Sequence, residues 1–272
     1  MLSGIGSVAG IDVGFSPTKR SSAICRLDWD SEVVAWSLRR FRATDEDRRA
    51  AIEDITKASK PLATAIDGPL MRGFPIIGRY RAAERMLTRR LQPHIGKPGQ
   101  SSAPVGRALN HHANLCAQVL LDACEVGPAA HPQAIHQRAI AEAFRSSYLG
   151  MLLTEPKTVL AARKDRSDVF FAALAADGTL PRLLAYLLPG RRIGDVTSIK
   201  NHDDRAAFIC ALTALSVAAG DYTAVGDDDG WIILPPVAFV VPWARELLIA
   251  NESDDETGRF VICKSNLGDR VT

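Results

Sequence analysis

Residues 7–41 read SVAGIDVGFSPTKRSSAICRLDWDSEVVAWSLRRF, and this stretch decides the fold. It holds three runs of strand-forming residues, at 7–14, 22–27 and 32–41, with a turn-like DWDS before the third. Parallel neighbours need a crossover of about a dozen residues, so strands that follow one another this closely pair antiparallel. The sequence therefore predicts a sheet that begins with three antiparallel strands.

The next elements predict a change to parallel pairing. Thr44 is a typical helix N-cap with three acids behind it, and its helix should reach about Ala58. The PLATAI run at 61–66 follows this helical crossover, which predicts a fourth strand parallel to the first. The IAEAF run at 140–144 is a fifth strand, and residues 203–219 form a late apolar helix. This element order is similar to that of the ribonuclease H-like fold, an α/β layout whose mixed sheet is flanked by helices.

The rest of the chain is predicted to extend this core and not to form a second domain. Residues 1–272 are predicted to be a single domain. Helical patterns fill an insertion at about 146–200, and a strand extension with a DDDG turn covers about 222–272.

Composition excludes several classes of protein. Hydrophobic residues make up 47% and charged residues 24% of the chain, which is ordinary for a globular domain. The most apolar stretch, at 206–220, is too short to span a bilayer, and the first residues lack the pattern of a signal peptide. Five cysteines contain no CxxC pair, which disfavours a disulfide framework or a cysteine zinc site. We expect a cytoplasmic protein with no membrane partner.

Acidic residues interrupt the predicted strands at apolar positions. Asp12 lies inside GIDVG, Asp67 ends the fourth strand in AIDGPL, and Glu142 lies inside IAEAF. A buried carboxylate is costly unless it is paired or binds a ligand, and open α/β sheets bind ligands at the carboxyl ends of their strands. Asp203 and Asp204, at the start of the late helix, are further candidates. The structural alternative for each acid is a turn residue or a helix cap.

Together these acids predict a two-cation site. The candidate catalytic residues are Asp12, Asp67, Glu142, Asp203 and Asp204, and the candidate metal ligands are Asp12, Asp67, Glu142 and Asp203. Hard oxygen ligands suit Mg²⁺ or Mn²⁺. Two such ions activate a water and stabilise the leaving oxygen of a phosphodiester. The expected function is a metal-dependent nuclease.

A basic block lies between residues 71 and 110, with eight Lys or Arg against one acid, Glu84. It includes a predicted helix at 79–91, on which three arginines repeat every fourth residue. Such a block predicts an anionic partner, and the alternative is a solvated helix face. The candidate nucleic-acid-binding residues are Arg72, Arg79, Arg81, Arg85, Arg89 and, outside the block, Lys19.

Several motifs resemble one known family. They are GIDVG, AIDGPL, YRAAERMLTRRL, EAFRSSYLGMLL, ARKDRSDVFFAAL and DDRAAFICALTA, in the family's order. Over about 8–236 the chain resembles the bacterial and archaeal family called "domain of unknown function 429", a set of predicted nucleases with a ribonuclease H-like fold. The resemblance implies acidic site positions at Asp12, Asp67, Glu142 and the Asp203/Asp204 pair.

The chain departs from this family pattern at two positions. Arg145 stands where the family often has Pro, and Ala206 stands where it has Asp. Asp203 lies three residues before Ala206, so it can supply a carboxylate from the same helix face.

Two alternatives to a nuclease stay open. The string DVGFSPTK resembles the first phosphate loop of actin-like kinases and ATPases, with Lys19 in reach of a phosphate. The further Gly-Thr expected after AIDGPL in such kinases is absent. The other alternative is a non-catalytic module that binds nucleic acid or protein on the same fold, and Ala206 favours it.

Overall fold

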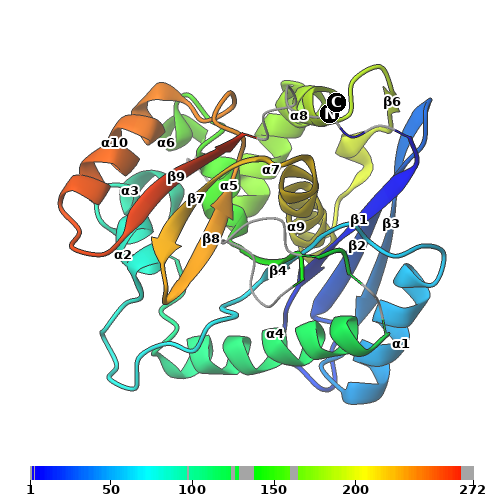
Figure 1. The fold of residues 1–272 in the computed structure, drawn as a ribbon, viewed down its shortest axis with the longest axis horizontal. Helices are drawn as coiled ribbons and strands as arrows, with labels where there is room; N and C mark the ends of the chain where they lie inside the picture. Colours follow the sequence, from blue (N-terminus) through cyan, green and yellow to red (C-terminus); the bar gives the residue numbers. More distant parts are fainter. Residues whose placement is uncertain are drawn as a thin grey trace, which may run out of the picture.

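The computed structural model describes residues 2, 4–96, 98–123, 126–128, 138–159 and 165–264. Within these residues, nine strands form one mixed sheet in the order β6-β3-β2-β1-β4-β5-β8-β7-β9 (Figure 1). The strands are β1 (Gly6–Asp12), β2 (Ser22–Trp29), β3 (Val33–Phe41), β4 (Thr64–Asp67), β5 (Ile140–Ala143), β6 (Arg192–Ile193), β7 (Asp221–Asp227), β8 (Gly230–Leu234) and β9 (Arg259–Lys264). Strands β1 to β3 pair antiparallel, and β4 and β5 run parallel to β1. The predicted antiparallel start and parallel continuation of an α/β sheet are confirmed.

Helices flank this sheet. In the described residues they are α1 (Asp45–Thr56), α2 (Ala82–Thr88), α3 (Gln92–Ile95), α4 (Pro104–Ala123), α5 (Arg145–Gly150), α6 (Pro156–Val159), α7 (Arg166–Ala176), α8 (Thr179–Leu187), α9 (His202–Ala219), α10 (Pro242–Ser253) and a 3₁₀ turn (Val196–Ser198). The helix predicted at 79–91 is shorter, because Arg81 is the N-cap of α2 and Pro93 has no N–H for the carbonyl of residue 89.

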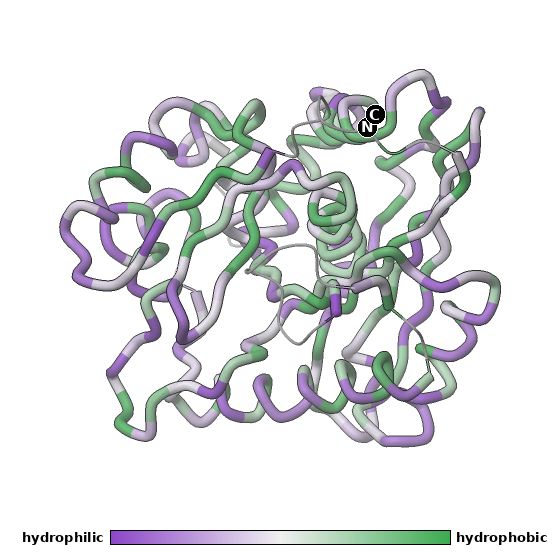
Figure 2. The backbone as a smooth tube through the Cα atoms, in the orientation of Figure 1, coloured by the Kyte–Doolittle hydropathy of each residue, from purple (hydrophilic) through white to green (hydrophobic). Residues whose placement is uncertain are grey.

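The late helix α9 packs across the central strands. It contacts β1, β2 and β4, while α4 and α1 lie on the other side of the sheet (Figure 1). Every residue of 206–217 is buried, so this helix is enclosed on all sides. Figure 2 shows the same result: the residues of α9 and of the central strands are mostly hydrophobic, and those of the outer turns are mostly hydrophilic.

Gly10 explains the close approach of α9 to the sheet. A Cβ on this residue would lie 2.0 Å from the Ala211 nitrogen and 2.4 Å from the Ala207 oxygen. The glycine before Asp12 therefore makes room for a helix backbone.

Replacing Gly10 by Ala should lower the free energy of unfolding by about 3 kcal/mol, at the upper end of overpacking costs, because helix backbone atoms cannot rotate away. Gly99→Ala is the matched control, since a Cβ there would meet nothing within 4 Å. Urea denaturation of both variants measures the difference. Equal midpoints would show that α9 shifts at little cost.

The C-terminal extension completes the sheet. The predicted turn at residues 227–230 is confirmed as the β7–β8 hairpin, and β8 pairs parallel with β5. The sequence patterns did not reveal α10 or the edge strand β9. In the described part of the chain no single helix is long and apolar enough to cross a membrane, and only α7 and α8 taken together, with a 74° bend, reach that length.

Candidate functional site

Asp12 and Asp67 come together at the carboxyl ends of two neighbouring strands. They are register partners in the parallel pair β1–β4, so both side chains leave the sheet on the same face. Gly10 lies two residues before Asp12 and faces α9, which identifies that face as the one that α9 covers. Their side chains are 10% and 16% exposed, so both carboxylates are largely withdrawn from water.

A single guanidinium contacts both carboxylates. Arg145 is the first residue of α5, just beyond the carboxyl end of β5, and β5 is the neighbour of β4. Its Nη1 lies 3.2 Å from Asp12 Oδ1 and its Nε lies 3.6 Å from Asp67 Oδ2. The side chain is 20% exposed. Arg145 thus occupies the place between the carboxylates that the sequence predicted for a cation.

Arg145 also connects this pair to a histidine. Its Nη2 lies 2.9 Å from His202 Nε2, and His202 Nδ1 lies 3.0 Å from Asp168 Oδ2. Because a guanidinium has only donors, Nε2 accepts and the ring proton lies on Nδ1, which donates to Asp168. Arg205 ion-pairs with the other oxygen of that aspartate, at 3.4 Å. The result is one chain of polar contacts from Asp12 to α7.

Burial and neighbouring acids both act against ionisation of the pair. Burial raises the pKa of Asp12 well above its usual range, Arg145 lowers it in part, and Asp67, Asp203 and Asp165 raise it further. Burial likewise raises the pKa of Asp67, against the opposing effect of Arg145. The guanidinium therefore compensates the pair only partly.

Glu142 does not join this pair. It is the register partner of Ile66, one residue before Asp67, so its side chain leaves the sheet on the opposite face. Its carboxylate accepts from Arg81 Nη2 at 2.6 Å, from Arg81 Nη1 at 2.9 Å and from the Leu70 N–H at 3.0 Å. The expectation that Glu142 shares a pocket with Asp12 is wrong, because strand register alternates the faces.

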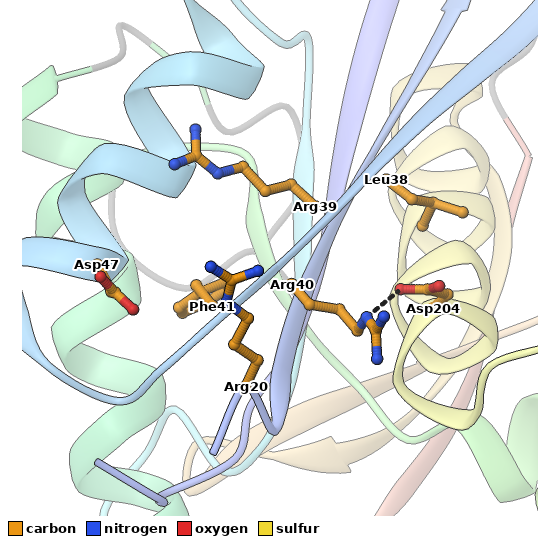
Figure 3. A pocket seen from close by; sticks show the side chains of 7 residues that line it. All are labelled: Arg20, Leu38, Arg39, Arg40, Phe41, Asp47 and Asp204. Atoms are coloured by element: carbon orange, nitrogen blue, oxygen red, sulfur yellow. Dashed lines mark ion pairs between the residues drawn. The ribbon is translucent and has the colours of Figure 1, made fainter. Parts of the chain in front are cut away.

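The two acids of α9 separate. Asn201 caps the helix by accepting from the N–H groups of Asp203 and Asp204. Asp203 is close enough to Asp12 to raise its pKa. Asp204 instead ion-pairs with Arg40, at 3.8 Å, on the wall of a separate pocket (Figure 3).

This pocket has a volume of about 380 Å³ and is lined by both basic and acidic side chains. Arg20, Arg39 and Arg40 line it together with Asp47 and Asp204, and in Figure 3 Arg20 lies between Asp47 and Arg40. Lys19, the candidate phosphate-loop lysine, is exposed in the preceding position.

Most of the predicted arginine stripe is structural. Arg81 is 1% exposed and is held by Glu84 and Glu142, so it is not available to a phosphate backbone. Arg85 and Arg89 are about one-third exposed and both ion-pair with Asp255, at 2.8 and 3.3 Å. The interpretation of Arg81 as a nucleic-acid contact is wrong, because its guanidinium is buried between two carboxylates. For Arg85 and Arg89 a role in nucleic-acid binding stays a prediction.

Two of the candidate cations stay on the surface. Arg79 stacks on the Phe74 ring with its Cζ 4.1 Å from the ring centroid. Arg72 is exposed and makes no hydrogen bond or ion pair with any described residue. Lys97, also in the basic block, lies outside the described residues.

The residues present do not fit the predicted two-cation centre. Arg145 lies between Asp12 and Asp67, Glu142 is held by Arg81 on the other face, and Ala206 has no carboxylate. Across the described ranges, no three His, Cys, Asp or Glu side chains are arranged to hold a metal ion.

Sequence reasoning missed several members of the site. Asp165 and Asp168 lie in the ARKDRSDVFFAAL motif, as the N-cap and a first-turn residue of α7, and their spacing of three residues was the available signal. Arg145 was visible only as a departure from a family pattern. Its contacts depend on the order of β1, β4 and β5 in the sheet.

Comparison with protein-family models, with curated proteins and with solved structures finds no match for this chain.

Proposed function

We propose that this chain is a nucleic-acid-binding protein whose carboxylate pair is occupied by its own arginine and does not work as a two-cation nuclease. The observation that carries the proposal is the contact of Arg145 with both Asp12 and Asp67. A tethered cation in that place competes with any diffusible one, since both need the same oxygens. The proposal corresponds to the non-catalytic alternative.

The fold assignment belongs to the same proposal. Three antiparallel strands followed by parallel β4 and β5, with the late helix α9 against β1, are the arrangement expected of a ribonuclease H-like protein. Membership of "domain of unknown function 429" is likewise proposed, on the motifs alone.

Exposed cations at the carboxyl end of the sheet support a nucleic-acid partner. Lys19 and Arg20 lie in the loop that leaves β1, and Arg72 lies in the loop that leaves β4. Because β1 and β4 are parallel, both loops emerge at the same edge of the sheet. Cations spaced along one edge suit a phosphate backbone.

A second candidate is the metal-dependent phosphodiesterase that the sequence predicted. The observation that favours it is the excess of acid, because Asp165 and Asp203 add to the negative charge around Asp12 and Asp67. That excess favours entry of a further cation.

The two candidates differ in a cleavage and binding experiment. Labelled single-stranded and duplex DNA and RNA are titrated at several salt concentrations and then incubated with Mn²⁺. We expect binding that weakens with salt, with a slope of about −0.7 to −0.9 per neutralised phosphate. Wild type and Asp12→Asn should bind equally, and neither should cleave.

Mn²⁺-dependent cleavage by the wild type that Asp12→Asn lacks would establish the second candidate. No binding to any of the four substrates at low salt would refute both.

A further inference from the structure

A groove of about 760 Å³ lies between the loop that follows β4 and the first half of α4. This volume is within the range of small-molecule sites, roughly 300 to 1,000 Å³. None of the described residues that line it is acidic. The loop is tied to the sheet where the Leu70 N–H donates to Glu142, so the groove begins near the strand ends.

Two guanidinium groups give this groove a positive charge. Arg72 has no partner among the described residues. Arg107 donates one N–H to the Pro75 carbonyl at 2.7 Å and has its other donors free within the described part of the chain. Arginine's planar fork matches a phosphate group. With no acid on the wall, the groove favours an anionic ligand.

The same two walls also offer acceptors and a ring. Asn110 donates through Nδ2 to the Pro69 and Met71 carbonyls, and Asn114 donates to the Leu70 carbonyl. These bonds orient each amide, so both Oδ1 atoms are left as acceptors. Phe74 also lines the groove with Arg79 stacked on one face of its ring, and a base stacked on the other face would contribute about 1 to 3 kcal/mol.

A buried hydroxyl completes the wall. Ser101 lines the groove and is 1% exposed, yet its Oγ has no hydrogen-bond partner in the described structure. A Cβ built on Gly73 would lie 2.3 Å from this Oγ, so the hydroxyl packs behind the loop and helps to hold the groove wall in place.

We infer that this groove binds one nucleoside phosphate unit, with the phosphate on Arg72 and Arg107 and the base against Phe74. The amide oxygens of Asn110 and Asn114 accept from an exocyclic amino group of the base. The inference rests on the proposed function and adds that the partner is single-stranded, because bases in a duplex are already stacked and paired.

The test is fluorescence anisotropy with a labelled single-stranded oligonucleotide and a hairpin duplex of the same composition. Phe74→Ala should weaken single-strand binding about 5- to 150-fold, from the stacking contribution of one base, and leave duplex binding unchanged. Arg72→Ala should weaken it and flatten the salt slope by about 0.7 to 0.9. The matched control is Arg245→Ala, an exposed arginine on α10 with no partner in the described chain.

Melting curves check that each variant is folded. Single-strand binding that is the same in Phe74→Ala, Arg72→Ala and Arg245→Ala would overturn the groove while the proposed function stands. Absence of binding by the wild type would overturn both. Competition by unlabelled mononucleotides at comparable concentration would identify a free nucleotide as the source of the ligand.

Discussion

Replacing Arg81 by Met is expected to lower the free energy of unfolding by about 3 to 5 kcal/mol, because it leaves two buried carboxylates without a positively charged partner. Arg81 and Glu84 are each 1% exposed and Glu142 is 3% exposed. At about 2 to 4 °C per kcal/mol for a domain of this size, the melting temperature should fall by roughly 10 °C. Thermal and urea denaturation measure both quantities.

Two further variants make this result specific to charge. Arg79→Met removes a neighbouring surface arginine that only stacks on Phe74, and it should change stability by less than about 1 kcal/mol. Adding Glu84→Gln and Glu142→Gln to Arg81→Met should restore most of the loss, because no buried charge is then left unpaired. If Arg81→Met and Arg79→Met have the same melting temperature, Arg81, Glu84 and Glu142 do not form a linked ion network.

Replacing Arg145 by Met is expected to destabilise the protein by about 2 to 3 kcal/mol at pH 8, somewhat less than for a fully buried pair, since this site is partly exposed. The loss should shrink as the pH falls towards 4. Asp12 and Asp67 both have raised pKa values in the folded state. A raised carboxyl pKa means stability that is present at low pH and lost as the pH rises through the folded value. Arg145 lowers both pKa values, so its removal raises them further and increases the stability that is lost at high pH.

The same variant tests whether the arginine takes the place of a divalent ion. Saturating Mn²⁺, at about 100 times its dissociation constant, should return roughly 2.7 kcal/mol to Arg145→Met, because the carboxylates are then free to bind it. The wild type should gain little. Adding Asp12→Asn should abolish the rescue. An equal gain in wild type and Arg145→Met would show that the ion binds elsewhere or that Arg145 does not obstruct it.

Asp12→Asn alone, unlike Arg145→Met, is not expected to destabilise the protein. Since the folded environment disfavours the charged form of Asp12, the neutral amide should be as stable as wild type or more stable at pH 7. Its advantage should disappear at low pH, where the carboxyl is neutral in both states. A large loss of stability at every pH, seen in melting curves from pH 4 to 8, would make Asp12 a structural acceptor for Arg145.

Local sequence was enough for the first half of the fold. The short links within 7–41 leave antiparallel pairing as the only choice, and the helix after Thr44 is long enough for a parallel crossover. Antiparallel pairing after a short link and parallel pairing after a helical crossover both depend on the number of residues between two strands, which can be counted in the sequence. The same holds for Asp12 and Asp67, because each directly follows or interrupts an apolar strand that ends at the same edge of the sheet.

Side-chain partners were decided by the tertiary structure. A shift of one residue in register sends Glu142 to the opposite face from Asp67, and no local pattern specifies that register. Arg81 and Arg85 have the spacing of a surface stripe, yet their partners Glu142 and Asp255 lie 61 and 170 residues away. Arg145 reaches Asp12 only because β4 lies between β1 and β5. Charge and periodicity belong to the sequence, whereas pairing across a sheet depends on strand order and register, which form only when the whole core packs.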